Sequence, residues 1–307
     1  MGTKIMRTYY VWPSFPSISI SGTRCALNCL HCNKKYLTPM ISANTPEKFL
    51  EACLELKNKG ANGILISGGC DKKGGLLNLQ KFLPTIKFVK KETGFIIKLH
   101  TGFVDKKLAA KIVDAGVDIA SLEVVGSDDS IQEIFGLNAK VQDYVDTLVN
   151  LEAAGIKHIA PHIAVGLHYG KLNGEFRALE LIHENIHPSA IIIIVFIPTK
   201  STELENISAP SGSDAGKVVK RAKELFPKTP IVLGAMRPRS SARNSKNGKI
   251  RYGIEKCAVD NGITGIELPS SATVDYITQR GYKIKKINAY GVLPMEYEDK
   301  VEWEWVR

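Results

Sequence analysis

Three of the six cysteines in this 307-residue chain lie close together, at Cys25, Cys29 and Cys32. Grouped thiols in a reducing compartment indicate metal ligation before disulfides. The Cys-x3-Cys-x2-Cys spacing fits three corners of a cubane iron–sulfur cluster, and such clusters normally have four cysteine ligands. One iron would therefore lack a protein ligand and could bind a substrate. The alternatives are a zinc site formed by these cysteines with His31, and a loop that binds no metal.

The other three cysteines are scattered along the chain. Cys70 directly follows an apolar strand candidate. We expect Cys70 close to the three grouped cysteines, in a pocket at the end of that strand. It would serve there as an active-site thiol, as a ligand of an auxiliary iron–sulfur cluster, or as a small residue beside a ligand. Cys53 and Cys257 lie within amphipathic helical patterns, so both are expected to fill core positions. A ligand role is the alternative for Cys257.

The elements that must position these residues alternate along the chain. Short β-branched runs predict eight strands at Ser17–Ser21, Gly63–Ser67, Phe95–His100, Asp118–Glu123, His158–Val165, Ala190–Ile197, Pro230–Ala235 and Gly262–Leu268. Helical periodicity predicts eight helices at Pro46–Asn58, Leu77–Lys91, Lys106–Ala115, Val141–Ala154, Gly174–Glu184, Asp214–Leu225, Ile250–Asn261 and Ser271–Gln279. Thr45 as N-cap, Pro46 at the first helical position and Gly60 beyond the last turn support these boundaries.

Eight strand–helix units in series predict an α/β fold with a parallel sheet covered on both faces. We expect a single TIM-like (β/α)8 barrel over residues 1–282, with a short C-terminal extension, residues 283–307, packed on the barrel. In such a barrel the chemistry lies at the C-terminal ends of the strands. Glycines and polar residues gather at these positions in Ser67-Gly68-Gly69-Cys70, His100-Thr101-Gly102, Glu123, Gly166-Leu167-His168, Pro198-Thr199 and Arg237-Pro238-Arg239-Ser240-Ser241.

These strand ends predict a broad polar pocket at one barrel mouth. Arg237 or Arg239 is expected to anchor a carboxylate there, because a guanidinium group binds carboxylates through two parallel hydrogen bonds. The three histidines near the mouth are expected as hydrogen-bonding wall residues: His100, His162 and His168. The acidic pair Asp128-Asp129 is expected to cap the helix that follows it.

Charge and hydropathy exclude two classes of partner. The 41 Lys and Arg residues exceed the 31 Asp and Glu residues by ten, but they occur in short, dispersed pairs without interleaved aromatic residues. A nucleic-acid platform is therefore not expected, and the surplus is either solvated surface or a complement to an acidic protein or anionic substrate. The longest apolar run, Ala190–Pro198, is shorter than the roughly 20 residues that a membrane-spanning helix needs. We expect a soluble, cytoplasmic protein.

The cysteine loop after the first strand of an α/β barrel resembles the signature of the radical S-adenosylmethionine (radical SAM) superfamily. This resemblance implies that Cys25, Cys29 and Cys32 hold a [4Fe-4S] cluster and that S-adenosylmethionine is the second cofactor. It also implies a low-potential electron donor such as ferredoxin. Reductive cleavage of S-adenosylmethionine would give methionine and a 5′-deoxyadenosyl radical, which abstracts hydrogen from an unactivated carbon.

Later strand ends are similar to the superfamily's contacts with S-adenosylmethionine. Ser67-Gly68-Gly69 resembles the Gly-Gly-Glu stretch whose backbone meets the methionyl ammonium, with Cys70 in place of the glutamate. The resemblance implies that His31 lies near adenine and that Glu123 contacts ribose or the methionine carboxylate. Two more segments are similar to the family's fifth- and sixth-strand contacts, Ala164-Val165-Gly166 and Pro198-Thr199-Lys200-Ser201-Thr202.

More narrowly, the chain resembles the archaeal biotin-synthase-related group that includes a subunit of the two-component lipoyl synthase. The matching segments are Ser19-Ile20-Ser21-Gly22-Thr23-Arg24, Ser121-Leu122-Glu123-Val124-Val125-Gly126-Ser127 and Gly234-Ala235-Met236-Arg237-Pro238. This resemblance implies sulfur insertion into C–H bonds of an octanoyl chain, with an auxiliary iron–sulfur cluster as sulfur donor. A second radical SAM subunit and an acidic carrier protein are the implied partners. Ala235 stands where the related sequences commonly have cysteine.

Two other functions remain open. The first is a radical SAM enzyme of cofactor biosynthesis or rearrangement that does not insert sulfur. The second is a non-catalytic subunit that binds the cluster and assembles with a catalytic partner.

Overall fold

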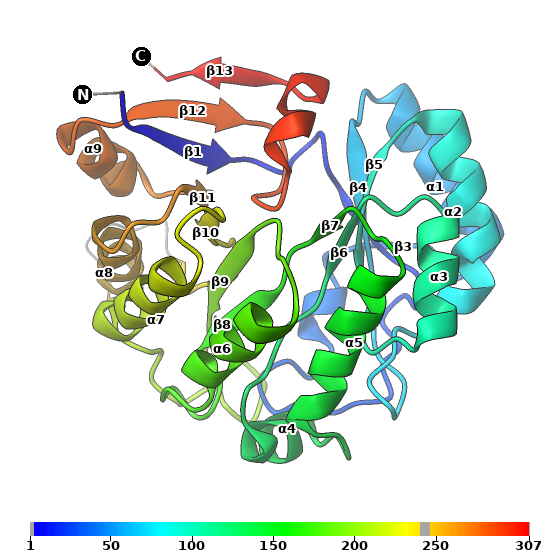
Figure 1. The fold of residues 1–307 in the computed structure, drawn as a ribbon, viewed down its shortest axis with the longest axis horizontal. Coiled ribbons are helices and arrows are strands. Elements are labelled where there is room, and N and C mark those ends of the chain that lie inside the picture. Colours follow the sequence, from blue (N-terminus) through cyan, green and yellow to red (C-terminus); the bar gives the residue numbers. More distant parts are fainter. Residues whose placement is uncertain (1–2, 240–245, 307) are drawn as a thin grey trace.

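The computed structural model describes residues 3–239 and 246–306, in which strands and helices alternate (Figure 1). The strands are β1 Ile5–Tyr9, β2 Ser17–Ser19, β3 Ile41–Ser42, β4 Gly63–Ser67, β5 Ile96–His100, β6 Ile119–Ser121, β7 His158–Ile159, β8 His162–Val165, β9 Ile191–Val195, β10 Ile231–Leu233, β11 Gly265–Glu267, β12 Lys283–Ile287 and β13 Trp303–Trp305. The α-helices are α1 Pro46–Asn58, α2 Leu79–Thr93, α3 Lys106–Asp114, α4 Asp128–Phe135, α5 Val141–Ala153, α6 Glu175–Asn185, α7 Gly212–Leu225, α8 Lys246–Asp260 and α9 Ser271–Gln279. Two short 3-10 helices are η1 Lys35–Leu37 and η2 Met295–Lys300.

Local capping chemistry explains where the helices begin. The Thr45 side chain accepts a hydrogen bond from the Lys48 amide (3.3 Å), so α1 has the predicted N-cap and the predicted bounds. The start of α4 differs from the prediction, because Ser127 is the N-cap and accepts from the Ser130 amide (3.3 Å). Asp128 and Asp129 occupy the first turn instead. There Asp128 accepts a hydrogen bond from the amide of Val141, the first residue of α5.

The strands of the described residues form two sheets. One has the order β3-β2-β4-β5-β6-β7 and the other β13-β12-β1-β11-β10-β9-β8. The chain passes from β7 directly into β8 through Ala160 and Pro161, so the two sheets share one predicted strand. All strand pairs are parallel except β12 with β13. The eight predicted strands are β2, β4, β5, β6, β7 with β8, β9, β10 and β11, which confirms the TIM-like α/β fold.

The two ends of the chain extend one of the two sheets in a way that was not predicted. Strand β1 lies between β11 and β12 and is paired with both in parallel. No strand pairing joins β1, β12 or β13 to β2 or β3 within the described residues. Instead, the ring of Phe15 lies 6.3 Å from the ring of Tyr290 in an edge-to-face arrangement. The C-terminal extension therefore contributes two strands, β12 and β13, to the sheet as well as packing on it.

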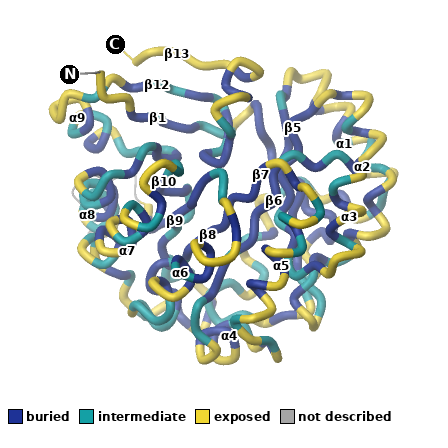
Figure 2. The backbone as a smooth tube through the Cα atoms, in the orientation of Figure 1, coloured by how far each residue is buried: buried dark blue, intermediate teal, exposed yellow. Residues whose placement is uncertain are grey.

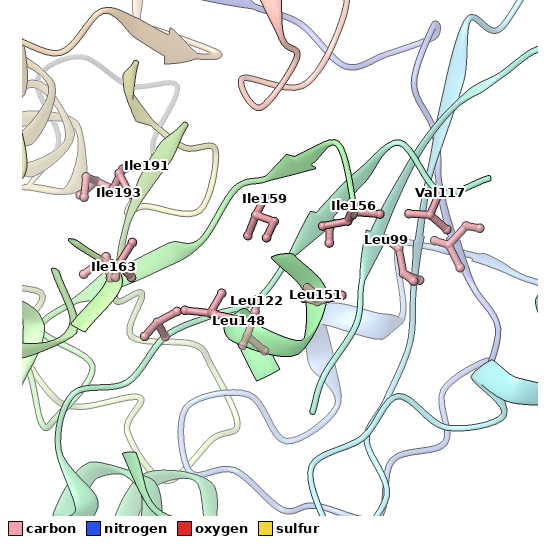
Figure 3. Close-up of a cluster of buried hydrophobic side chains, with 14 of the residues drawn as sticks. Leu99, Val117, Leu122, Leu148, Leu151, Ile156, Ile159, Ile163, Ile191 and Ile193 are labelled. Carbon is pink, nitrogen blue, oxygen red and sulfur yellow. The ribbon is translucent and has the colours of Figure 1, made fainter. Parts of the chain in front are cut away.

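The core has two main layers. Apolar side chains on the outward faces of the strands pack against the helices, as Leu99, Leu122 and Ile163 do with Leu148 and Leu151 of α5 (Figure 3). A second cluster fills the barrel at the beginnings of the strands. It joins strand residues to the C-terminal segment and comprises, among others, Ile96, Ile119, Ala160, Ile192, Val232, Val292, Leu293 and Tyr297. Figure 2 shows the buried strands inside and the exposed turns of the helices outside.

The helices carry no membrane-spanning segment within the described residues, since none is both long and apolar enough.

Candidate functional site

The cysteine loop follows β2 at the C-terminal end of the sheet and is fixed to two neighbouring elements. The Ala26 amide donates to the Cys70 carbonyl (2.8 Å), and the Cys70 amide donates to the Cys25 sulfur (3.3 Å). Further along the loop, the Leu30 amide donates to the Ile134 carbonyl of α4 (2.9 Å). The loop is thus held between the end of β4 and the end of α4, and all three of its cysteines are partly exposed.

The glycine pair after β4 allows this close approach. A Cβ atom on Gly69 would lie 2.2 Å from the Arg24 carbonyl oxygen and 2.5 Å from the Cys25 Cβ. The Gly69 amide donates to the Ser21 hydroxyl (2.8 Å), which ties the segment Ser67–Gly69 to the first residues of the cysteine loop. The structure therefore brings the predicted contacts Ser67, Gly68 and Gly69 directly beside the cysteines.

A pocket next to this loop is built around Glu123, which follows β6 and pairs with His162 in an isolated parallel bridge. Burial raises the pKa of this carboxyl group to about 7. Gly126 and Gly174 close one side of the pocket, because a Cβ on Gly126 would lie 2.2 Å from the Gly174 carbonyl oxygen. His168 also lines the pocket, as a wall residue should, and its Nδ1 lies 3.1 Å from the Ser130 hydroxyl.

Two lining residues of this pocket were missed by sequence reasoning, Asn173 and Glu175. Glu175 accepts hydrogen bonds from the Gly166 amide (2.7 Å) and the Asn173 amide (2.6 Å). Asn173 donates in turn to the hydroxyls of Ser127 and Ser130 (3.1 and 3.2 Å). Gly166 therefore supports the pocket wall through the hydrogen bond from its backbone amide to the Glu175 carboxylate. The signal in the sequence was weak: an acidic residue in the first turn of α6.

The short helix η1, which follows the cysteine loop, contacts the loop after β9. The Tyr36 hydroxyl lies 2.8 Å from the Thr199 hydroxyl, which places Pro198 and Thr199 beside the cysteine loop. His31 lies between aromatic rings, 5.3 Å from Phe135 and 6.3 Å from Tyr36. Its Nδ1 is buried without a hydrogen-bond partner, and burial lowers its pKa to about 4. Tyr36 is a positioning residue that the sequence analysis did not identify.

Arg237 does not lie where the sequence analysis expected it. The side chain is fully buried and forms an ion pair with Glu255 (2.7 Å). Its remaining donors bind the backbone carbonyls of Gly234, Glu267 and Leu268. All three nitrogens of the guanidinium group donate inside the protein, so Arg237 connects β10, β11 and α8 and is not presented to a substrate carboxylate.

Arg239 is exposed at the mouth, as expected for an anchoring residue, but its guanidinium group donates to the Ala235 carbonyl (3.0 Å). The adjacent Ser240 and Ser241 lie outside the described residues. Cys53 is fully buried in the core, as predicted, and Cys257 is partly buried on α8. Cys70 is partly buried beside Cys25, and burial raises its pKa to about 12.

The donor set fits an iron–sulfur cluster better than a single ion. No three His, Cys, Asp or Glu side chains in the described ranges gather around one point where a single metal ion could bind. A cubane cluster places each thiolate on a different iron, so its ligands need not meet at one point. The thiol of Cys29 has a raised pKa through burial and through the neighbouring thiols, so a metal must displace its proton on binding.

Comparisons with characterised sequences identify biotin synthases as distant relatives. The chain is 25% identical to the biotin synthase of Vesicomyosocius okutanii subsp. Calyptogena okutanii (strain HA) over 228 residues, which cover 72% of this chain and 68% of that protein. It is 28% identical to the biotin synthase of Coxiella burnetii (strain Dugway 5J108-111) over 223 residues, with 71% and 68% covered. The match to the biotin synthase of Vibrio atlanticus (strain LGP32), at 24% identity, covers 72% of this chain and 63% of that protein. The chain thus spans about two thirds of the length of these relatives.

Solved structures share the fold at low sequence identity. The hydrogenase maturase HydG superimposes with a TM-score of 0.62 and 14% identity, covering 86% of this chain and 56% of that one. Methylornithine synthase (PylB) superimposes with a TM-score of 0.56 and 17% identity, covering 86% and 72%. The family model described as the Radical SAM superfamily matches residues 19–173, which include the cysteine loop, Glu123 and the pocket wall up to Asn173. This match extends over half of the chain, and the protein belongs to the radical SAM superfamily.

Proposed function

We propose that this protein is a radical SAM enzyme that abstracts hydrogen from an unactivated carbon of its substrate. Cys25, Cys29 and Cys32 would hold a [4Fe-4S] cluster, and the strand-end residues Ser67–Gly69 and Glu123 would contact S-adenosylmethionine. The observation that carries the proposal is the direct contact between the cysteine loop and the end of β4, through the Cys70 amide and Gly69.

Cys25, Cys29 and Cys32 would hold the cluster, which would supply the electron for cleavage of S-adenosylmethionine to methionine and a 5′-deoxyadenosyl radical, with a low-potential donor such as ferredoxin as the source of that electron. The protein's own side chains bind and orient. Glu123 presents a carboxyl group that can accept or donate a hydrogen bond near neutral pH, because its pKa is about 7. His31 and its aromatic neighbours provide an apolar wall, and the Tyr36–Thr199 contact keeps the cysteine loop closed against the loop after β9.

The test is anaerobic reconstitution of the full chain with iron and sulfide, followed by metal analysis. Cys25→Ala should lose the iron of that cluster, about four atoms per chain, whereas the matched control Cys257→Ala should retain it, because Cys257 lies on α8 outside the loop. The wild type with dithionite and S-adenosylmethionine should release 5′-deoxyadenosine. Full iron content in Cys25→Ala would refute the cluster assignment. Iron without any 5′-deoxyadenosine would favour a non-catalytic partner subunit.

The finer proposal is sulfur insertion of the lipoyl-synthase type, with an auxiliary cluster, a second radical SAM subunit and an acidic carrier protein. The distant likeness to biotin synthases and the surplus of ten positive charges support it. The position of Cys70 beside Cys25 makes it the candidate ligand for that cluster. Two four-iron clusters predict about eight irons per chain, and Cys70→Ala should then hold about four. A wild type with only about four irons would favour rearrangement or cofactor biosynthesis without sulfur insertion.

A further inference from the structure

Polar side chains point into the barrel from three adjacent parallel strands. On β5, Ile97 and Leu99 belong to the outer core layer, so the alternate residues Lys98 and His100 face the interior. On β6, the neighbours of Ser121 belong to that same outer layer, so Ser121 also faces inward. His162 of β8 does likewise, and its ring lies 5.3 Å from the ring of His100. We call these four residues the interior polar cluster.

The interior polar cluster is buried, and of its side chains only that of His162 has a hydrogen-bond partner in the described part of the chain, since its Nδ1 lies 3.1 Å from the Ala160 carbonyl oxygen. Lys98 is 3% exposed, Ser121 is 1% exposed and His162 is 9% exposed. The Ser121 hydroxyl and the His100 Nε2 are buried without any partner. The Lys98 ammonium has no hydrogen-bond acceptor among the described residues and lies 4.7 Å from the centre of the Tyr290 ring. Burying such groups unpaired costs several kcal/mol unless a ligand or water completes them.

Glu267 is the nearest candidate for an internal counter-ion to Lys98, and it is already engaged. Its two carboxylate oxygens accept hydrogen bonds from the backbone amides of Ala235 and Gly291, each at 2.7 Å. No ion pair within 4.0 Å joins Lys98 to an acidic residue of the described chain. Burial lowers the pKa of Lys98 to about 8, and Glu267 opposes that shift only in part. The amine therefore lacks the anion that would hold it fully charged.

Three residues of the cluster lie deeper in the barrel than Glu123. His100 pairs in register with Ser121 at the ends of β5 and β6, two residues before Glu123, whereas His162 pairs with Glu123 and lies level with it. Lys98 precedes His100 by two residues, which places it about 7 Å further from the mouth at the rise of an extended strand. A molecule that reaches Lys98 from the mouth must pass the two histidines.

We propose that the interior polar cluster binds a carboxylate group of the substrate, with Lys98 as the cation and Ser121 and His100 as hydrogen-bond donors. This inference rests on the proposed function, because it assumes that the molecule in the barrel is the hydrogen donor. It sets the orientation of that molecule. The carboxylate enters first and is held at depth, and the carbon that loses hydrogen stays near the mouth, between Glu123 and the cysteine loop.

The test uses the full chain reconstituted with iron and sulfide and loaded with S-adenosylmethionine, and it measures binding by isothermal titration calorimetry near pH 7. The probes are hexanoate and its neutral isostere hexanamide. Hexanoate should bind and hexanamide should not. Lys98→Met should weaken hexanoate binding about 30-fold or more, because it removes one partner of a buried charge pair. Ser121→Ala should weaken it about tenfold through one lost charge-assisted hydrogen bond.

The matched control is Lys107→Met, an exposed lysine on α3, which should bind hexanoate as the wild type does. Equal binding of both probes, no binding of hexanoate at millimolar concentration, or undiminished binding in Lys98→Met and Ser121→Ala would each overturn the inference. The proposed function fails on a different result, the absence of 5′-deoxyadenosine from the wild type with dithionite. If hexanoate binding depends on Lys98 but the protein forms no 5′-deoxyadenosine, the anion site is supported and the proposed radical chemistry is refuted.

Discussion

Gly69 lies at the point where the strand β4 segment meets the cysteine loop, and its lack of a side chain brings the two together. A Cβ atom there would overlap the Arg24 carbonyl oxygen and the Cβ of Cys25. Both clashing groups are backbone or close to it, so neither can rotate away. The cysteine loop can therefore occupy this position only because residue 69 has no Cβ atom.

Gly69→Ala is therefore expected to displace the loop. We predict a loss of about 1–3 kcal/mol in the free energy of unfolding, as for other overpacked sites, together with reduced iron content after reconstitution. Chemical denaturation and metal analysis measure the two effects. Gly253→Ala is the control, since a Cβ at that position of α8 meets nothing within 4 Å. Unchanged iron binding in Gly69→Ala would show that the loop can shift without losing the cluster.

Glu123 makes the stability of the cluster-free protein depend on pH. Its pKa rises from 4.5 to about 7 on folding because burial disfavours the carboxylate. The folded state then binds a proton that the unfolded state has released, so wild-type stability should fall as the pH rises from about 4.5 to about 7. Glu123→Gln removes this dependence and should gain relative to the wild type over that interval. Urea denaturation at several pH values measures the difference.

The exposed Glu51→Gln is the control for this comparison and should follow the wild type at every pH. If the stabilities of wild type and Glu123→Gln run parallel between about pH 4.5 and 8, Glu123 is ionised in the folded protein and the pocket is more polar than its contacts indicate.

At the scale of elements, the last strands of the barrel are joined by one buried ionic network. Glu255 of α8 pairs with Arg237 after β10, and it also accepts hydrogen bonds from Arg251 and from the hydroxyls of Ser270 and Thr273. Burial alone would raise the pKa of Glu255, but Arg237 and these hydrogen bonds lower it to about 2. The network fixes α8 and the start of α9 to the strand ends. Its side chains are held inside the protein, so they stabilise the residues around the barrel mouth and do not line the mouth itself.

Arg237→Met should cost about 3–5 kcal/mol in the free energy of unfolding, because it leaves the Glu255 carboxylate buried and unpaired. Chemical denaturation tests this value. Lys59→Met, which removes one partner of the exposed Lys59–Glu55 pair, should cost less than about 1 kcal/mol. A small effect for Arg237→Met combined with weakened substrate binding would restore the sequence-based interpretation of Arg237 as a mouth residue.

At the scale of the whole molecule, the C-terminal segment is an integral part of the barrel. Strand β12 pairs with β1 over five residues, and the segment after it fills the barrel at the beginnings of the strands. Gly291 reaches Glu267 inside the barrel, where a Cβ on the glycine would crowd the glutamate side chain. The boundary predicted between residues 282 and 283 separates two paired strands.

A chain that ends at residue 282 should therefore show no cooperative unfolding transition, because β1 loses one of its two partner strands and the apolar cluster at the beginnings of the strands is exposed. A chain that ends at residue 301 keeps β12 and the apolar cluster at the beginnings of the strands, and it loses the edge strand β13. It should therefore unfold cooperatively with a modest loss of stability. Circular dichroism during urea denaturation distinguishes them. Cooperative unfolding of the shorter chain would establish residues 1–282 as an independent domain.

The sequence by itself determined the chemistry of the cysteine loop and the alternation of strands and helices. Both are local properties: ligand spacing lies within eight residues of chain, and periodicity with caps such as Thr45 sets the bounds of a helix. The glycine pair at the end of β4 likewise indicated that two backbone segments lie close together there, and the structure places Gly69 against Cys25. The eight-strand order followed because strand–helix units repeat.

Only the tertiary structure decided which groups face one another across the barrel. Strand β1 was not predicted because its sequence, Ile-Met-Arg-Thr-Tyr, is not a continuous apolar run. Its place between β11 and β12 depends on partners more than 250 residues away. The direction of Arg237 depends on Glu255, which belongs to another element. Lys98 is unusual because no acidic residue in the described part of the chain forms an ion pair with it, although the side chain is buried. Pairing across long distances creates such environments, and neither composition nor spacing contains them.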